Sequence, residues 1–147
     1  MSTTKRKREP RVAAFASVHY EVLEKLRKEM TALKQELTDD YDKRDLSNFV
    51  PIVISNFTTF GSEIHAMIRL AKSFGLAEDD RLVQVRGLDE QLELKGCQLL
   101  FLLAVIGSRA CERDFSSGIR LIKGVLSGIS KIQARCRDVG SQKGTHG

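Results

Sequence analysis

Side chains that suit a helix–helix contact recur along this chain at alternating spacings of three and four residues, the repeat of helices that pack side by side. The first such stripe runs through seven intervals without a break, at Val12, Ala16, His19, Leu23, Leu26, Met30, Leu33 and Leu37. Pro10 precedes the stripe and suits the first turn of a helix, because the amide hydrogen that proline lacks has no partner there. We therefore expect a helix from Pro10 to Asp39.

Three further segments carry the same repeat, and we expect each to be a helix. The second helix is expected from Ser47 or Asn48, either of which can cap it, to Phe74. Pro51 is tolerated in its first turn, and Gly75 suits the left-handed position that follows a helix end.

The third helix is expected from Leu88 and is apolar on nearly all sides between residues 97 and 107. Such a helix lies either at the centre of a bundle or in an oligomer interface. A strand is the alternative both for this run and for the β-branched residues 52–54, although the unbroken repeat favours helices. The last helix is expected from near Ser116 to just before Gly140.

Two shorter features leave their interpretation open. Residues 76–87 form either a short helix capped by Asp79 or Asp80 or a brief extended segment, which ends at Gly87 in both cases. Gly124 and Gly128 lie four residues apart. They either leave a shallow groove into which another helix can pack or only lower the helix propensity, by about 1 kcal/mol each relative to Ala.

The predicted fold class is therefore all-α: an elongated bundle of four long helices with heptad-type packing. At about 1.5 Å per residue each helix is about 35–42 Å long. Because this is long for a single-chain bundle of 147 residues, we expect a homo-oligomer. Residues 1–10 are expected to be a disordered basic tail, residues 11–140 the helical bundle domain and residues 141–147 a second disordered tail. The residues expected in the heptad interface of the oligomer are Leu23, Leu26, Met30, Leu33 and Leu37.

Composition excludes several classes of protein. Hydrophobic residues make up 41% of the chain and charged residues 29%, which are the values of a globular domain and not of a disordered chain. The longest apolar run, residues 99–106, has eight residues, too few to span a membrane, and from the polar N-terminus we expect no secretory signal. The three cysteines have no paired spacing, so we expect no disulfide scaffold and interpret them as small core residues.

Residues for catalysis or for a cofactor are not grouped in this sequence. His19 lies in the first stripe, where a packing or register role is the ordinary one, and His65 lies beside the second. The cysteines are 14 and 25 residues apart, so they lack metal-site spacing, and no glycine-rich phosphate loop occurs. We expect no enzyme activity, no cofactor and no metal.

The net charge of +5 is unevenly distributed. Residues 1–11 carry a net charge of +4, residues 12–108 a net charge of −4 and residues 109–147 a net charge of +5. Two basic ends enclose an acidic middle. This layout suits polyanion binding at the ends, and it also suits self-association of the ends with the middle.

The tail holds the most specific short motif, four consecutive cations: Lys5, Arg6, Lys7 and Arg8. Such a run suits the acidic groove of a nuclear import receptor and equally suits phosphates. The alternative is a tail that only increases solubility.

The last helix is the second candidate, because its apolar and basic residues lie on opposite sides. Stepping 100° per residue places Ile122, Val125, Ile129, Ile132 and Cys136 on one side. The cations on the other side are Arg113, Arg120, Lys123, Lys131 and Arg135. A basic helix face suits a phosphate backbone, an anionic membrane or an acidic protein, and the alternative is a face that is merely solvated.

The charge layout favours a small helical protein that enters the nucleus, is also present in the cytoplasm and binds the backbone of duplex RNA or DNA. A viral accessory or packaging protein would fit this description. The alternatives are a coiled-coil interaction adaptor whose basic tail is only an import signal, and a self-assembling structural subunit.

Overall fold

The structure, a computed structural model, describes residues 2–39, 46–76, 78–106 and 112–145. Within these residues the chain forms four long helices and no strand, so the all-α prediction is confirmed and the two strand alternatives are wrong. The elements are α1 (Ser2–Asp39), the short 3-10 helix η2 (Leu46–Phe49), α2 (Val50–Ser73), α3 (Asp80–Ile106) and α4 (Glu112–Thr145).

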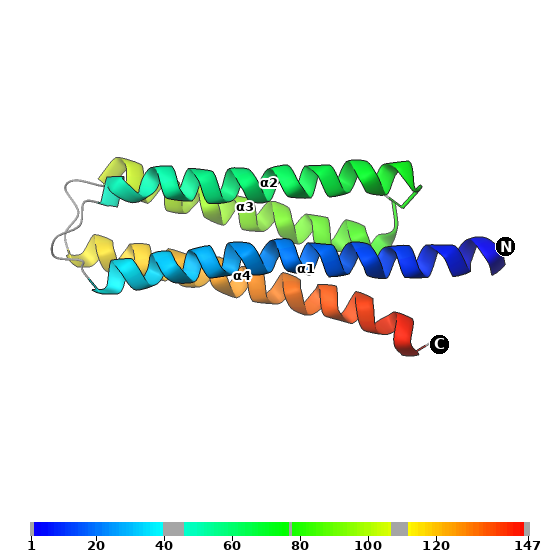
Figure 1. Cartoon of the computed structure of the whole chain (residues 1–147). Coiled ribbons are helices and arrows are strands. Elements are labelled where there is room, and N and C mark those ends of the chain that lie inside the picture. The colour runs from blue at the N-terminus through cyan, green and yellow to red at the C-terminus, as the bar shows by residue number, and fades with distance from the viewer. Residues whose placement is uncertain (1, 40–45, 77, 107–111, 146–147) are drawn as a thin grey trace.

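Consecutive helices run in opposite directions, and both chain ends lie at the same end of the bundle (Figure 1). α1 packs against α2 and α4, and α3 packs against the same two helices. The helices thus form a square in which α1 lies diagonally across from α3, and α2 diagonally across from α4. The contact between α1 and α4 is the most extensive.

The helix ends differ from the sequence predictions at both termini of the chain. α1 begins at Ser2 with Pro10 inside it, so a disordered tail over residues 1–10 is not confirmed and Pro10 is not in the first turn. Proline removes one hydrogen bond but does not by itself prevent a preceding turn. α4 passes through Gly140 and ends at Thr145, inside the stretch predicted as a second disordered tail.

Glycines end a helix only where they adopt a positive φ. Gly75 does, with a φ of 70°. Its amide donates to the carbonyl of Lys72 at 3.1 Å, and the amide of Leu76 donates to the carbonyl of Ala71 at 2.9 Å. This confirms the predicted end of α2. Gly87 has no positive φ, so its predicted role as a terminator is wrong.

The starts of α2 and α3 also follow from local contacts. Phe49, not Ser47 or Asn48, is the N-cap residue of α2, while Pro51 lies in the first turn as expected. α3 begins at Asp80, eight residues before Leu88. Of the two interpretations of residues 76–87, the helical one is therefore correct from Asp80 onward. The cap of α3 is the predicted Asp79, whose Oδ1 accepts a 3.0 Å hydrogen bond from the amide of Arg81.

The repeats of all four helices meet in one intramolecular core. The five residues assigned to an oligomer interface are each at most 3% exposed in the single chain: Leu23, Leu26, Met30, Leu33 and Leu37. That assignment therefore needs correction, because these side chains already pack inside the bundle. A heptad repeat specifies a helical neighbour but not whether the neighbour belongs to the same chain.

α3 is not a central helix, which was one of the two positions that its composition suggested. In a square of four helices each one has an outer side, and α3 exposes large apolar side chains there. The glycines allow close packing on its inner sides: a Cβ at Gly96 would lie 2.6 Å from the Phe57 ring of α2, and one at Gly128 would lie 3.3 Å from Leu92. Gly128 therefore provides the predicted close approach on α4, whereas nothing approaches Gly124 in this way.

The cysteines only partly match the core interpretation. Cys136 is buried, and burial raises the pKa of its thiol to about 12. Cys97 is exposed on α3, so for this residue the interpretation is wrong. Cys111 lies outside the described residues.

A buried polar pair crosses the core diagonally between α1 and α3. Nε2 of His19 lies 2.9 Å from Oδ1 of Asp89, and both side chains are at most 10% exposed. Oδ2 of Asp89 has no hydrogen-bond partner in the described part of the chain. Burial raises the pKa of the Asp89 carboxyl, and the hydrogen bond from His19 opposes this effect. His19 therefore contributes a buried polar contact to a stripe that is otherwise apolar.

Replacing one member of this pair leaves the other buried alone. We expect His19→Leu to lower the free energy of unfolding by about 3 kcal/mol, because Asp89 loses its partner inside the core. Adding Asp89→Leu to the same chain is expected to recover most of that loss. Urea unfolding of the three proteins measures both values; a double variant no more stable than His19→Leu would contradict the pairing.

Candidate nucleic-acid interface

The orientation of α4 is set by its buried side. Five residues of this side are each at most 3% exposed: Ile122, Val125, Ile129, Ile132 and Cys136. They pack into the core that α4 shares with α1 and α3. Because this whole stripe is buried, the opposite side of the helix faces outward.

All five predicted cations of the last helix lie on that outward side. Arg113, Arg120 and Lys131 are separated by 7 and 11 residues, which are close to whole numbers of helical turns. Lys123 lies toward α1, and Arg135 lies toward α3. Every one of the five is exposed. We call this set of five the α4 basic face; from Arg113 to Arg135 it is about 33 Å long.

Acids do not neutralise the α4 basic face along most of its length. Between Phe115 and Arg137 the chain has no Asp or Glu, and the exposed Asp138 lies just beyond. Among the described residues no ion pair involves any member of the face. The positive charge of this side is thus directed at solvent and is available to an anion.

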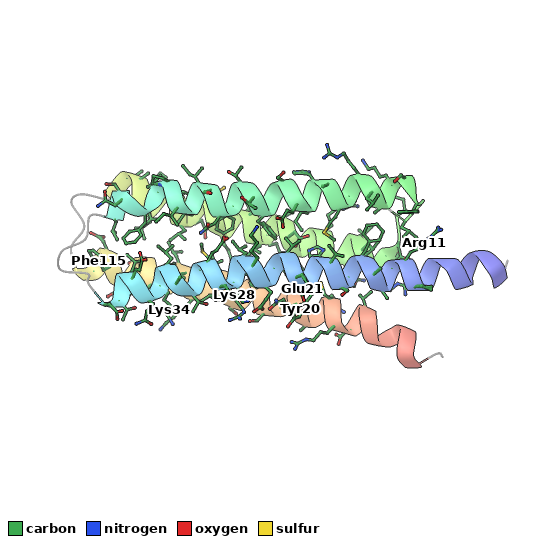
Figure 2. All side chains as sticks on the ribbon, viewed as in Figure 1. Arg11, Tyr20, Glu21, Lys28, Lys34 and Phe115 are labelled. Carbon is green, nitrogen blue, oxygen red and sulfur yellow. The ribbon has the colours of Figure 1, made fainter. Side chains whose placement is uncertain are left out.

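α1 contributes the neighbouring surface on one side. Lys28 is exposed and Lys34 half-buried, and Figure 2 shows both on the stretch of α1 that runs alongside α4. These lysines were not among the site residues predicted from the sequence. Their charge was visible in the sequence, but only the packing of α1 against α4 brings them beside the α4 basic face.

Arg27 also lies on α1, but its charge is already paired. Its guanidinium is hydrogen-bonded to both carboxylate oxygens of Glu24, with Nε 2.8 Å from Oε1. Nε2 of Gln133 on α4 donates to the same Oε1 at 3.1 Å. The hydrogen bonds from Arg27 and Gln133 lower the pKa of Glu24 to about 2. This group of three residues links α1 to α4 at the edge of the basic face.

Two further contacts join α4 to α1 and to α3. The guanidinium of Arg137 lies 5.7 Å from the centre of the Tyr20 ring on α1, within range of a cation–π interaction. On the α3 side, Nζ of Lys95 donates to the carbonyl of Gly124 at 3.3 Å. Lys95 thereby adds a cation on the α3 side of α4.

Lys5, Arg6, Lys7 and Arg8 lie in the first turns of α1, and their side chains lie outside the described part. The N-terminal turns of α1 extend past the end of α2, at the bundle end that also holds the C-terminus of α4 (Figure 1). The Arg135 end of the α4 basic face, and not its Arg113 end, is therefore the one directed toward the bundle end that holds Lys5–Arg8.

Two other kinds of feature, a metal site and a membrane-spanning helix, were sought among the described residues. No group of His, Cys, Asp and Glu among them is arranged to hold a metal ion. In the same residues no helix combines the length and the apolar character that crossing a membrane requires. Comparisons of the chain with protein-family models, with curated proteins and with solved structures found no match.

The lowered pKa of Glu24 predicts how acid acts on the link between α1 and α4. A carboxyl whose pKa falls from 4.5 to about 2 on folding stabilises the folded state above pH 4.5, and this contribution is lost as the pH falls toward 2. We expect Glu24→Gln to be less stable than the native chain at pH 7 and to lose less stability between pH 4.5 and 2. Thermal unfolding across this range measures the difference, with Glu36→Gln, an exposed change on the same helix, as control. Equal acid sensitivity of Glu24→Gln and the native chain would contradict the role of Glu24.

Proposed function

We propose that this protein binds the backbone of duplex nucleic acid through the α4 basic face, with Lys5–Arg8 as a second contact. The observation that carries the proposal is the division of α4 into two sides. One side is buried in the core, and the other holds five exposed cations without an ion pair among the described residues. A row of unpaired cations attracts phosphates and releases the counterions condensed on them.

The length and composition of the face support a duplex as the ligand. About 33 Å is close to one helical repeat of a duplex, about 34 Å, so one α4 can follow the phosphates across a groove. Phe115, the aromatic residue of α4, is 5% exposed and lies in the core. The face therefore offers no ring on which unpaired bases could stack, and backbone contacts are what remain.

A membrane surface is a weaker alternative for the same helix. Amphipathic helices that lie on membranes insert their apolar side between the lipids. In this bundle that side includes Ile122, Val125 and Ile129, each fully buried. Using it on a membrane would require α4 to leave the bundle.

The proposed location in the cell rests on the basic residues near the N-terminus. The run Lys5–Arg8 matches what a nuclear import receptor binds, so we propose a protein of the nucleus and the cytoplasm without enzyme activity. A compact accessory or packaging protein, of viral or cellular origin, would use the same features. The adaptor alternative is less favoured, because the heptad side chains that would recruit a partner helix, such as Leu26 and Leu33, are buried in the bundle.

Charge reversal on α4 tests the proposal. We expect Arg120→Glu/Lys131→Glu to weaken binding to a labelled duplex by about tenfold or more, and to lower the slope of log affinity against log salt by about 2, since each phosphate contact contributes about 0.9. Fluorescence anisotropy measures both quantities on duplex RNA and duplex DNA. A chain with Lys5–Arg8 replaced by Gln measures the contribution of the N-terminal contact in the same titration.

The matched control is Arg69→Glu/Lys72→Glu, which changes the charge by the same amount on exposed positions of α2. This helix is diagonal to α4, so the control is expected to bind nearly as well as the native chain. Equal losses in the two variants would indicate an effect of net charge alone and would contradict the α4 site. Absence of binding by the native chain at low salt would end the proposal.

A further inference from the structure

The outer side of α3 carries an uncharged stripe of mostly apolar side chains. Leu94, Phe101 and Val105 are 65%, 67% and 64% exposed. They are spaced by two helical turns and one, so they lie on one side of the helix. The other exposed residues from Leu94 to Val105 are also uncharged: Cys97, Gln98 and Ala104. We call this surface, about 17 Å long, the α3 stripe.

This surface is unusual for the outside of a bundle. Single exposed apolar residues are normal, but a continuous apolar patch marks a contact with another molecule. The chain is 29% charged, yet the twelve residues from Leu94 to Val105 contain one charged side chain, Lys95, which is directed toward α4. The inner sides of α3 are already filled, because Leu92, Leu99 and Leu103 lie in the core.

We infer that a second copy of this chain covers the α3 stripe, with the two α3 helices antiparallel about a two-fold axis near residues 98–101. A two-fold contact needs a surface that matches itself. In this arrangement Leu94 of one copy meets Val105 of the other, and Phe101 packs over Gln98. An uncharged stripe also brings no like charges together in a chain whose net charge is +5.

Charge decides between the antiparallel and the parallel arrangement. The exposed acid next to the α3 stripe is Glu90. Parallel helices would place the two Glu90 carboxylates side by side, where they repel each other. In antiparallel helices the two Glu90 carboxylates are about 28 Å apart along the axis. The two helix dipoles then also point in opposite directions, which is favourable.

The antiparallel dimer has a consequence for the α4 basic face, and this step rests on the proposed function. The two-fold axis runs perpendicular to the helices, within the contact plane, from the α2 side to the α4 side of the square. Rotation about it leaves the outward direction of α4 unchanged, so both basic faces lie on one side of the dimer. With helices about 8–10 Å apart, the two α4 axes are roughly 20–25 Å from each other, close to the width of one duplex.

The mass of the full chain in solution tests the dimer without any nucleic acid. Light scattering is expected to give twice the chain mass of 16.5 kDa for the native protein. Phe101→Glu and, independently, Leu94→Lys are expected to give the mass of one chain, because each places charges in the contact. The control Leu70→Glu changes a side chain that is 52% exposed on α2, and it is expected to remain a dimer.

A native protein that is monomeric at about 100 μM would overturn the inference, since a dimer this weak has no role at lower concentrations. Dimers of both Phe101→Glu and Leu94→Lys, with the helical circular dichroism of the native chain, would overturn it as well. If one variant loses its helical signal, the mass of the other variant decides the test, because the two substitutions introduce opposite charges at separate positions.

Disulfide trapping tests the direction of the helices. In a chain with Cys97→Ser and Cys111→Ser, we add Leu94→Cys to one preparation and Val105→Cys to another. The antiparallel dimer predicts a cross-link mainly when the two preparations are mixed. Cross-linking within each preparation alone would show parallel helices and would contradict the proposed arrangement.

The link to duplex binding has its own readout. Phe101→Glu is expected to lower the salt slope of duplex binding to about half, because one α4 basic face is then bound where two were before. An unchanged slope would show that duplex binding does not depend on the dimer. If the native chain binds no duplex, the proposed function fails, while the mass and the cross-links still decide whether the dimer exists.

Discussion

The packing of α1 against α4 is the contact on which the other features depend. Each helix carries one stripe of repeated apolar residues, and both stripes are buried together along most of their length. Burying one side of a helix leaves only the other side for a partner. On α4 that remaining side is basic, so the energetics of the core fix the position of the cations. The Glu24–Arg27–Gln133 group then joins the two helices at the rim of this surface.

α3 is not divided into a buried apolar side and an exposed polar side as α1 and α4 are. Its inner sides are apolar and buried, but its outer side is apolar too, along the stripe from Leu94 to Val105. The two surfaces occupy neighbouring helices, since α3 packs against α4. One is suited to phosphates and the other to a second copy, and the symmetry of an antiparallel dimer places the two α4 basic faces on the same side. Polyanion binding is therefore compatible with a dimer through α3, which is a different contact from the association of the basic ends with the acidic middle that the charge layout suggested.

Much of the fold was predictable from the sequence, because a repeat of three and four residues specifies a helix and its buried side. The sidedness of α4 was predicted in this way, and the Gly75 terminus was predicted from the conformational freedom of glycine. Asp79 was one of two candidate caps in a segment for which an extended structure was also considered. What the repeat does not specify is the neighbour: Leu23 and Leu26 pack within the chain and not between chains. Glycine alone was a poor boundary signal, since Gly87 and Gly140 adopt helical φ values. The exposure of Cys97, the pairing of His19 with Asp89 and the lysines of α1 beside α4 required the three-dimensional packing.

The central claim is that the α4 basic face, held outward by the core, is where a polyanion binds. The most direct measurement is a map of NMR chemical-shift changes in the full chain as a short duplex is added. The account predicts that the largest changes fall on the exposed residues of α4 from Arg113 to Arg135 and on Lys28 and Lys34 of α1, with the helices intact. Changes concentrated on α2, or spread evenly over all exposed lysines and arginines, would contradict it.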